Sequence, residues 1–156
     1  MNAEKIIKKL KDQKKTISTM ESCTGGYVAN EITNNKGASE ILKFSAITYS
    51  NEYKIKMGVD EKIIDQYTVY SMETAKEMSK KISDFAHSDY GIGITGKMKQ
   101  KDENNPYGED NVVFISIYDK EKDTYYTNKI EVCFSSRKQN KKFITDIVIE
   151  MLIDLL

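Results

Sequence analysis

Residue types that often build catalytic or metal sites are scarce in this chain of 156 residues. It contains one histidine (His87), one arginine (Arg137), one proline, two cysteines (Cys23 and Cys133) and no tryptophan. Two distant cysteines and a single histidine argue against a disulfide scaffold and against a structural zinc site. A serine–histidine–aspartate triad would have to use His87, and a bidentate arginine clamp on phosphate would have to use Arg137. Any base that works near neutral pH must be His87, a carboxylate, a tyrosine or a lysine of lowered pKa.

An excess of one charge and a long apolar run are also missing. Lys and Arg number 24, and Asp and Glu number 24, so the formal net charge is +0 and gives no sign of nucleic-acid binding. No apolar run approaches the ~18 residues that span a bilayer, and the first five residues lack the apolar core of a signal peptide. We therefore expect a cytoplasmic protein with no nucleic-acid or membrane partner. Its length suits one domain over residues 1–156.

The hydrophobic pattern alternates between helical and strand-like segments. Apolar spacing of three and four residues predicts helices over 3–11, 27–33, 51–57, 61–66, 72–85 (with Ser71 as N-cap) and 138–156. Segments that are β-branched or alternate predict strands over 16–20, 44–49, 90–95, 111–118 and 125–134, the last two as a hairpin. Gly91 and Gly93 predict close packing of another backbone or a ligand against the third strand. This mixture favours an α/β layered sandwich with a mixed sheet.

The segment Glu21–Gly26 places a serine between a predicted strand and a predicted helix. Its glycines let the backbone turn tightly and let a ligand approach it. Amide N–H groups at a helix start can hold a phosphate, or the oxyanion that forms when a nucleophile attacks a carbonyl. Two interpretations follow: Ser22 is a nucleophile beside such donors, or Ser22 or Thr24 only caps the helix. Cys23 is a rival nucleophile, but no histidine is near it in sequence to activate it.

Three motifs follow one another in the chain. Met20–Gly26 has the sequence M-E-S-C-T-G-G, Gly37–Ser39 has G-A-S, and Tyr49–Lys54 has Y-S-N-E-Y-K, followed by Gly58-Val59. They resemble, in the same order, the A-E-S-C-T-G-G, G-A-S and Y-S-N-x-x-K motifs of the CinA C-terminal domain family, which includes the bacterial nicotinamide-nucleotide amidases. The resemblance covers nearly the whole chain.

The resemblance implies a fold, a reaction and three catalytic residues. The implied fold is a three-layer α/β/α sandwich with a mixed β-sheet, often in homo-oligomers. The implied reaction is hydrolysis of the carboxamide of nicotinamide mononucleotide to nicotinic acid mononucleotide and ammonia, with no metal or organic cofactor. By resemblance, Ser22 is the nucleophile, Lys54 is the base that activates it, and Tyr49 assists the pair. The residues expected to bind the oxyanion or the substrate are Thr24, Gly25, Gly26, Asn51, Thr95, Gly96 and Arg137.

A lysine base has a chemical requirement of its own. The amine must be neutral to accept a proton, whereas the pKa of a free lysine is near 10.4. Lowering that pKa by about three units costs roughly 4 kcal/mol, which burial or a neighbouring cation must supply. Lys54 lies among Tyr53, Ile55 and Met57, so partial burial is expected. Without the motif, a lysine on a short helix would be interpreted as a solvated surface charge.

The chain departs from the family in the segment Thr95–Lys101. A glycine-rich family loop, T/S-G-I-A-G-P, is replaced here after Thr95 and Gly96 by long side chains. Lys97, Lys99 and Lys101 either offer cations to a phosphate or form a solvated charge run. The family's G-A-V-S is altered here to Thr68-Val69-Tyr70-Ser71, and the bulky Tyr70 fills a pocket or packs in the core. Arg137, in a stretch that resembles F-x-G-x-R, contacts phosphate or caps a neighbouring helix.

Three functions remain open at this point. The first is an active nucleotide amidase with a Ser22–Lys54 centre. The second is a non-catalytic relative, a binding or regulatory module that keeps the fold and the turn. The third is an amidase that acts on a different small amide, with the loop around Lys97–Lys101 remodelled for it. The retained serine, lysine and Tyr49 favour the first and third, whereas the altered loop favours the second and third.

Overall fold

The computed structural model describes residues 3–98 and 109–156. The elements follow one another as α1 (Ala3–Gln13), β1 (Ile17–Glu21), α2 (Tyr27–Thr33), η1 (Ala38–Glu40), β2 (Leu42–Ile47), α3 (Asn51–Lys56), α4 (Glu61–Tyr67), α5 (Met72–Ala86), β3 (Tyr90–Gly96), β4 (Val112–Asp119), β5 (Thr124–Glu131) and α6 (Arg137–Leu155). Every predicted helix and strand is present. The predicted strand 125–134 is too long, because β5 ends at Glu131 and the chain then leaves the sheet to enter α6, whose N-cap is Ser136.

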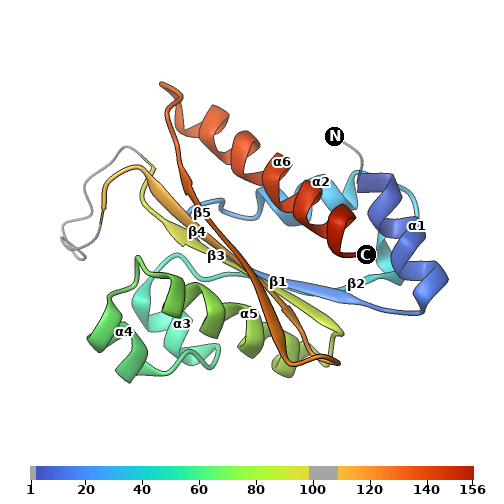
Figure 1. Ribbon diagram of the computed structural model, residues 1–156, viewed down its shortest axis with the longest axis horizontal. Helices are drawn as coiled ribbons and strands as arrows, with labels where there is room; N and C mark the ends of the chain where they lie inside the picture. Colours follow the sequence, from blue (N-terminus) through green and yellow to red (C-terminus); the bar gives the residue numbers. More distant parts are fainter. Residues whose placement is uncertain (1–2, 99–108) are drawn as a thin grey trace.

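The strands form one mixed sheet in the order β2-β1-β3-β4-β5. Strand β1 is parallel to both β2 and β3, and the remaining pairs, β3–β4 and β4–β5, are antiparallel. The predicted hairpin is therefore confirmed. Helices α1, α2 and α6 lie on one face of the sheet and α3, α4 and α5 lie on the other (Figure 1). This is the predicted three-layer α/β/α sandwich with a mixed β-sheet.

The core lies on both faces of the sheet. Strands β1 and β4 are buried along their whole length, which matches their position inside the sheet. A Cβ atom on Gly91 or Gly93 would overlap the carbonyl oxygen of Ser79 or Ala75 on α5. The two glycines therefore let α5 lie directly on β3, and the predicted close packing is against a backbone. None of the helices in the described part of the chain is long and apolar enough to cross a membrane.

The topology marks one edge of the sheet as a place for a ligand. The connection from β1 to β2 passes through α2, and the connection from β2 to β3 passes through α5 on the opposite face (Figure 1). Ligands of open α/β sheets bind outside the carboxyl ends of the strands, where such connections diverge. Ser22 follows β1 directly, Tyr49 follows β2 by two residues, and Lys97 follows β3. The residues predicted to form the site therefore meet at this edge.

Candidate active site

Ser22 and Lys54 form a buried pair. The Lys54 Nζ atom lies 3.0 Å from Ser22 Oγ and 2.7 Å from the carbonyl oxygen of Thr48. Ser22 is 7% exposed and Lys54 is 2% exposed. The expected approach of the two side chains is present, and the burial of Lys54 is more complete than the sequence predicted. The amine is thus within direct proton-transfer reach of the serine hydroxyl.

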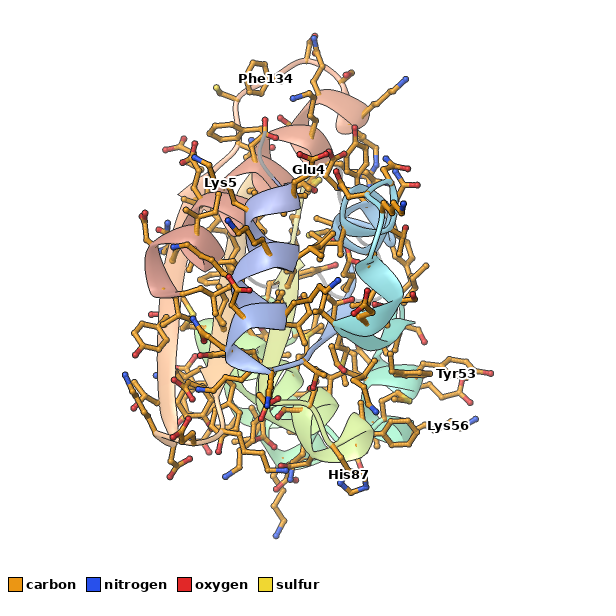
Figure 2. The ribbon with its side chains drawn as sticks, turned by 90° about the vertical axis from the view of Figure 1, so that its right-hand side faces the viewer. Glu4, Lys5, Tyr53, Lys56, His87 and Phe134 are labelled. Carbon is orange, nitrogen blue, oxygen red and sulfur yellow. The ribbon has the colours of Figure 1, made fainter. Side chains whose placement is uncertain are left out.

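The short helix α3 aims Lys54 inward. Ser50 caps the helix by accepting a hydrogen bond from the Tyr53 amide, and Asn51 is its first residue. Tyr53 and Lys56 project outward from the same helix (Figure 2), where Lys56 pairs with Glu52 at 2.8 Å. Lys54 is therefore the one fully buried residue of this helix, while Ile55 is partly buried against the core and Glu52, Tyr53 and Lys56 are exposed. The sequence alone indicated this only through the motif.

The turn after β1 holds Ser22 by backbone hydrogen bonds. The Ser22 amide donates to the carbonyl oxygen of Ile94 on β3 at 3.0 Å, and the Gly25 amide donates to the Ser22 carbonyl oxygen at 2.9 Å. Gly25 and Gly26 have φ values of +60° and +92°, a region that glycine adopts at little cost. The expectation that the Gly25 amide stays open to a ligand is wrong, because the turn uses it.

The buried Glu21 carboxylate caps the start of α2. It accepts hydrogen bonds from Thr24 Oγ1 at 2.7 Å and from the amides of Val28 and Ala29 at 3.0 Å each. These first-turn amides are therefore not available to a phosphate or an oxyanion, which corrects the sequence-based expectation. The amide of Gly26 has no acceptor among residues 3–98 and 109–156. It is the glycine donor of this turn that a ligand can still use.

Tyr49 and Arg137 are hydrogen-bonded to each other at the carboxyl edge of the sheet. Tyr49 is 61% exposed, and its hydroxyl accepts a hydrogen bond from Arg137 Nη2 at 2.9 Å. Arg137 Nη1 donates to the Met98 carbonyl oxygen at 3.1 Å. The arginine thus links the segments that follow β2 and β3 to the start of α6. The proposed assistance of Tyr49 to Ser22 and Lys54 stays a prediction.

Thr95 and Gly96 lie at the end of β3 and have structural partners. The Thr95 hydroxyl is buried and donates to the Val69 carbonyl oxygen at 2.9 Å. Gly96 pairs with Val113, and a Cβ atom there would collide with the backbone of β4. The glycine is thus required by the sheet itself. Contact of either residue with substrate stays a prediction.

Two rival catalytic residues are excluded by their surroundings. Burial raises the pKa of the Cys23 thiol to about 12, so the thiol stays protonated near neutral pH and is a poor nucleophile. His87 is exposed and caps the C-terminus of α5, just before β3 begins. It therefore lies at the opposite edge of the sheet from Ser22 and projects away from the protein (Figure 2). A triad through His87 does not form.

Lys97 is neither a solvated charge nor a mobile cation. It is 5% exposed, and its Nζ lies 5.0 Å from the centre of the Tyr70 ring and 3.8 Å from an Asp110 carboxylate oxygen. The interpretation as part of a solvated charge run is therefore wrong for this residue, its contact with a phosphate stays a prediction, and Lys99 and Lys101 lie outside the described residues. Tyr70 is half-buried and packs against the apolar residues under α5. In the described ranges, no three His, Cys, Asp or Glu side chains gather as a metal site would require.

Comparison with known proteins gives relatives of one kind. A competence-damage inducible protein of Clostridium beijerinckii is 38% identical over 145 residues, which cover 90% of this chain and 33% of that protein. A protein of the same name from Clostridium perfringens strain SM101 is 46% identical over 94 residues, which cover 60% of this chain and 23% of that protein. The chain therefore spans about a quarter to a third of the length of these relatives.

Solved structures and a family model complete the comparison. The crystal structure of a competence/damage inducible protein from Agrobacterium tumefaciens matches with a TM-score of 0.88 at 23% identity, covering 98% of this chain and 92% of that one. A competence or damage-inducible protein from Enterobacter asburiae matches with a TM-score of 0.89 at 21% identity, covering 98% and 94%. These structures share the fold. Because the model of the CinA C-terminal domain matches residues 1–156, the chain belongs to the CinA C-terminal domain family.

Proposed function

We propose that this protein is a serine–lysine amidohydrolase that converts nicotinamide mononucleotide to nicotinic acid mononucleotide and ammonia. One observation carries the proposal: the buried Lys54 Nζ lies 3.0 Å from Ser22 Oγ at the carboxyl edge of the sheet. The family resemblance supplies the substrate. No metal or organic cofactor enters the proposal, and we expect the protein to act in the cytoplasm and to assemble with copies of itself.

The geometry supports a two-stage reaction. A neutral Lys54 amine takes the proton of Ser22 as Oγ attacks the carboxamide carbon, and the Gly26 amide is one donor of the turn that can bind the resulting oxyanion. Lys54 then gives its proton to the departing nitrogen, the carbon–nitrogen bond breaks, and ammonia leaves an acyl-serine. Water, deprotonated by the same amine, hydrolyses that ester and restores Ser22. The Thr48 carbonyl oxygen keeps the amine oriented by accepting a hydrogen bond from it.

Burial of Lys54 supports the role of a base. Removing an amine from water disfavours its charged form, and Lys54 Nζ lies against two neutral oxygens, Ser22 Oγ and the Thr48 carbonyl. A lysine that served only as a surface charge would have no reason to be 2% exposed. The arrangement therefore fits a proton acceptor better than a structural cation.

The test is an ammonia-release assay with nicotinamide mononucleotide. Parent protein should release ammonia, Ser22→Ala should lose roughly a thousandfold or more in kcat because the nucleophile is gone, and Ser39→Ala should match the parent. Ser39 is an exposed serine on η1 and serves as the matched control. Failure of the parent to release ammonia from this substrate would contradict the proposal.

One observation favours a second candidate, an amidase for a different small amide. Lys97 stands packed on Tyr70 at the position where the family carries isoleucine in its glycine-rich loop. This packing gives the edge of the site a different lining. Ammonia release from other carboxamides, without release from nicotinamide mononucleotide, would support that candidate.

A further inference from the structure

We propose that Lys141, with Arg137 one helical turn before it on α6, forms a cationic subsite that binds the phosphate group of the substrate beside the Ser22 turn. The inference rests on the proposed function, because it takes the substrate to be a nucleoside monophosphate. Phosphate contact by Arg137 is already an expectation of the family resemblance, and the new assignment is Lys141, which takes a role that the sequence-based analysis considered for the lysines after β3.

The Lys141 side chain reaches from α6 to the turn that carries Ser22. Its Nζ atom lies 3.2 Å from the position that a Cβ atom on Gly25 would take, and Gly25 is the third residue after Ser22. Helix α6 lies beside α2 on the same face of the sheet (Figure 1), so its first turns border the turn that precedes α2. The absence of a side chain at position 25 therefore leaves room for this ammonium group.

No carboxylate compensates the charge of Lys141 within residues 3–98 and 109–156. The side chain is partly buried, yet it forms neither an ion pair nor a hydrogen bond with any described residue. Its neighbour Lys142, in contrast, pairs with Asp146 at 3.0 Å. The carboxylate of the same turn, Glu21, is already bonded to α2. A partly buried cation of this kind is stabilised by a bound anion.

Arg137 supplies a second positive charge on the same side of α6. Residues four apart on a helix lie on one face, so Arg137 and Lys141 extend toward the same edge of the sheet. The guanidinium is held in place by its hydrogen bonds to the Met98 carbonyl and the Tyr49 hydroxyl. An anion at this edge would thus meet a fixed planar guanidinium and a more flexible ammonium.

Phosphate is the anion that best fits two adjacent cations. A phosphate monoester carries a charge near −2 at neutral pH and offers three strong acceptor oxygens. The other described lysine considered for this task, Lys97, is buried against Tyr70 and faces Asp110. The described part of the site therefore offers α6, and not the residue after β3, as the source of cations.

A kinetic comparison tests the subsite in the active protein. In Lys141→Met, KM for nicotinamide mononucleotide should rise roughly 10- to 100-fold, as expected for one lost charge-assisted hydrogen bond, while kcat changes by less than about threefold. With the phosphate-free nucleoside, nicotinamide riboside, Lys141→Met and the parent should have the same kcat and KM. Lys138→Met is the matched control, since Lys138 is exposed on the same helix, and Lys141→Arg should restore most of the affinity.

A binding measurement separates this subsite from the proposed reaction. Inorganic phosphate should raise the Tm of Ser22→Ala protein, and this rise should shrink in the Ser22→Ala, Lys141→Met double variant. Unchanged KM and unchanged phosphate binding in the Lys141 variants would overturn the subsite and leave the amidase proposal intact. Phosphate binding that depends on Lys141, in a parent that releases no ammonia, would support the subsite and overturn the nucleotide-amidase function.

Discussion

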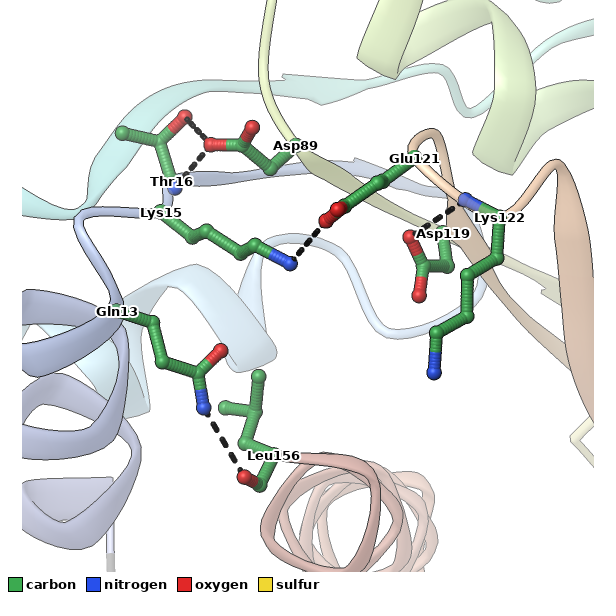
Figure 3. A network of polar contacts seen from close by, with 8 residues as sticks. All are labelled: Gln13, Lys15, Thr16, Asp89, Asp119, Glu121, Lys122 and Leu156. Carbon is green, nitrogen blue, oxygen red and sulfur yellow. Dashed lines mark hydrogen bonds and ion pairs between the residues drawn. The ribbon is translucent and has the colours of Figure 1, made fainter.

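The two ends of strand β1 hold charged groups in opposite ways. At the amino end, Lys15 pairs with Glu121 at 2.6 Å, and the Thr16 amide donates to Asp89 at 2.7 Å (Figure 3). The hydrogen bond to Glu121 raises the pKa of Lys15, and the same bond lowers the pKa of Glu121. Both groups therefore stay charged across the neutral range, in contact with water.

At the carboxyl end of β1, the ionisable groups are buried and contact hydroxyl, carbonyl and amide groups. Glu21 accepts from a hydroxyl and from two helix amides, and Lys54 contacts the oxygens of Ser22 and Thr48. Burial of ionisable groups costs free energy that a surface ion pair does not. Groups that carry such a cost are concentrated at functional sites, so the contrast favours the carboxyl end as the place of the proposed reaction.

The largest expected effect concerns the two lysines of this comparison. Lys54→Met and Lys54→Arg should both lower kcat/KM by roughly a thousandfold or more, because neither side chain can accept the serine proton. Lys15→Met should change kcat/KM by less than about twofold, since surface charges far from the site contribute little. Ammonia release measured from about pH 6 to about pH 10 should rise with pH in the parent as the amine loses its proton.

The Lys54→Arg variant tests whether Lys54 acts as a base or only through its charge. If Lys54→Arg kept most of the activity, the residue would act only through its charge. The base would then have to be sought at Tyr49 or at Glu21.

An intermediate effect concerns the two carboxylates. Glu21→Ala should lower the free energy of unfolding by about 2–4 kcal/mol, because two amides of α2 and the Thr24 hydroxyl lose a buried acceptor. Asp89→Ala should cost only about 1 kcal/mol, because water can reach the partly buried Thr16 amide. Urea unfolding measures both losses in the free energy of unfolding, provided that parent and variants have equal m values. Equal losses for the two variants would contradict the distinction between a buried and a surface carboxylate.

The smallest effect concerns the surface pair itself. Glu121→Gln should lower Tm by roughly a degree, and high salt should remove the difference. Because the pKa of folded Glu121 is lowered, the stabilisation is present above its unfolded pKa and is lost as acid protonates it. Because the pKa of folded Lys15 is raised, the stabilisation is lost again in strong alkali. A Tm difference that persists in strong acid would show that the pair acts through packing.

Local patterns predicted the elements well, because their causes lie within a few residues. Apolar spacing located α5, and Ser71 caps it by accepting from the Thr74 amide as predicted. Gly91 and Gly93 indicated a close backbone, which is α5. The strand predicted over 125–134 ends three residues earlier, at Glu131, since the sequence pattern does not show where the chain leaves the sheet.

Long-range contacts explain what the sequence did not predict. Glu21 precedes Val28 by seven residues, so no capping pattern marked it as the group that occupies the start of α2. Gly25 looked like a free donor until the turn was seen to use its amide. Lys97 stood in a run of lysines that is typical of a solvated segment, yet it lies under Tyr70 and Asp110. For Glu21 and Lys97 the partner comes from another element of the fold, whereas the Gly25 amide bonds to Ser22 within the same turn.

The sequence by itself determined the order of helices and strands, the family, and the identity of the serine and the lysine, because periodicity and motif spacing are local properties. Only the tertiary structure decided that Lys54 is buried 3.0 Å from Ser22, that Glu21 occupies the helix donors, and that α6 brings Lys141 to the same turn. Burial and charge environment depend on which distant segments fold over a residue. Those segments meet only when the sheet and its two helical layers are assembled.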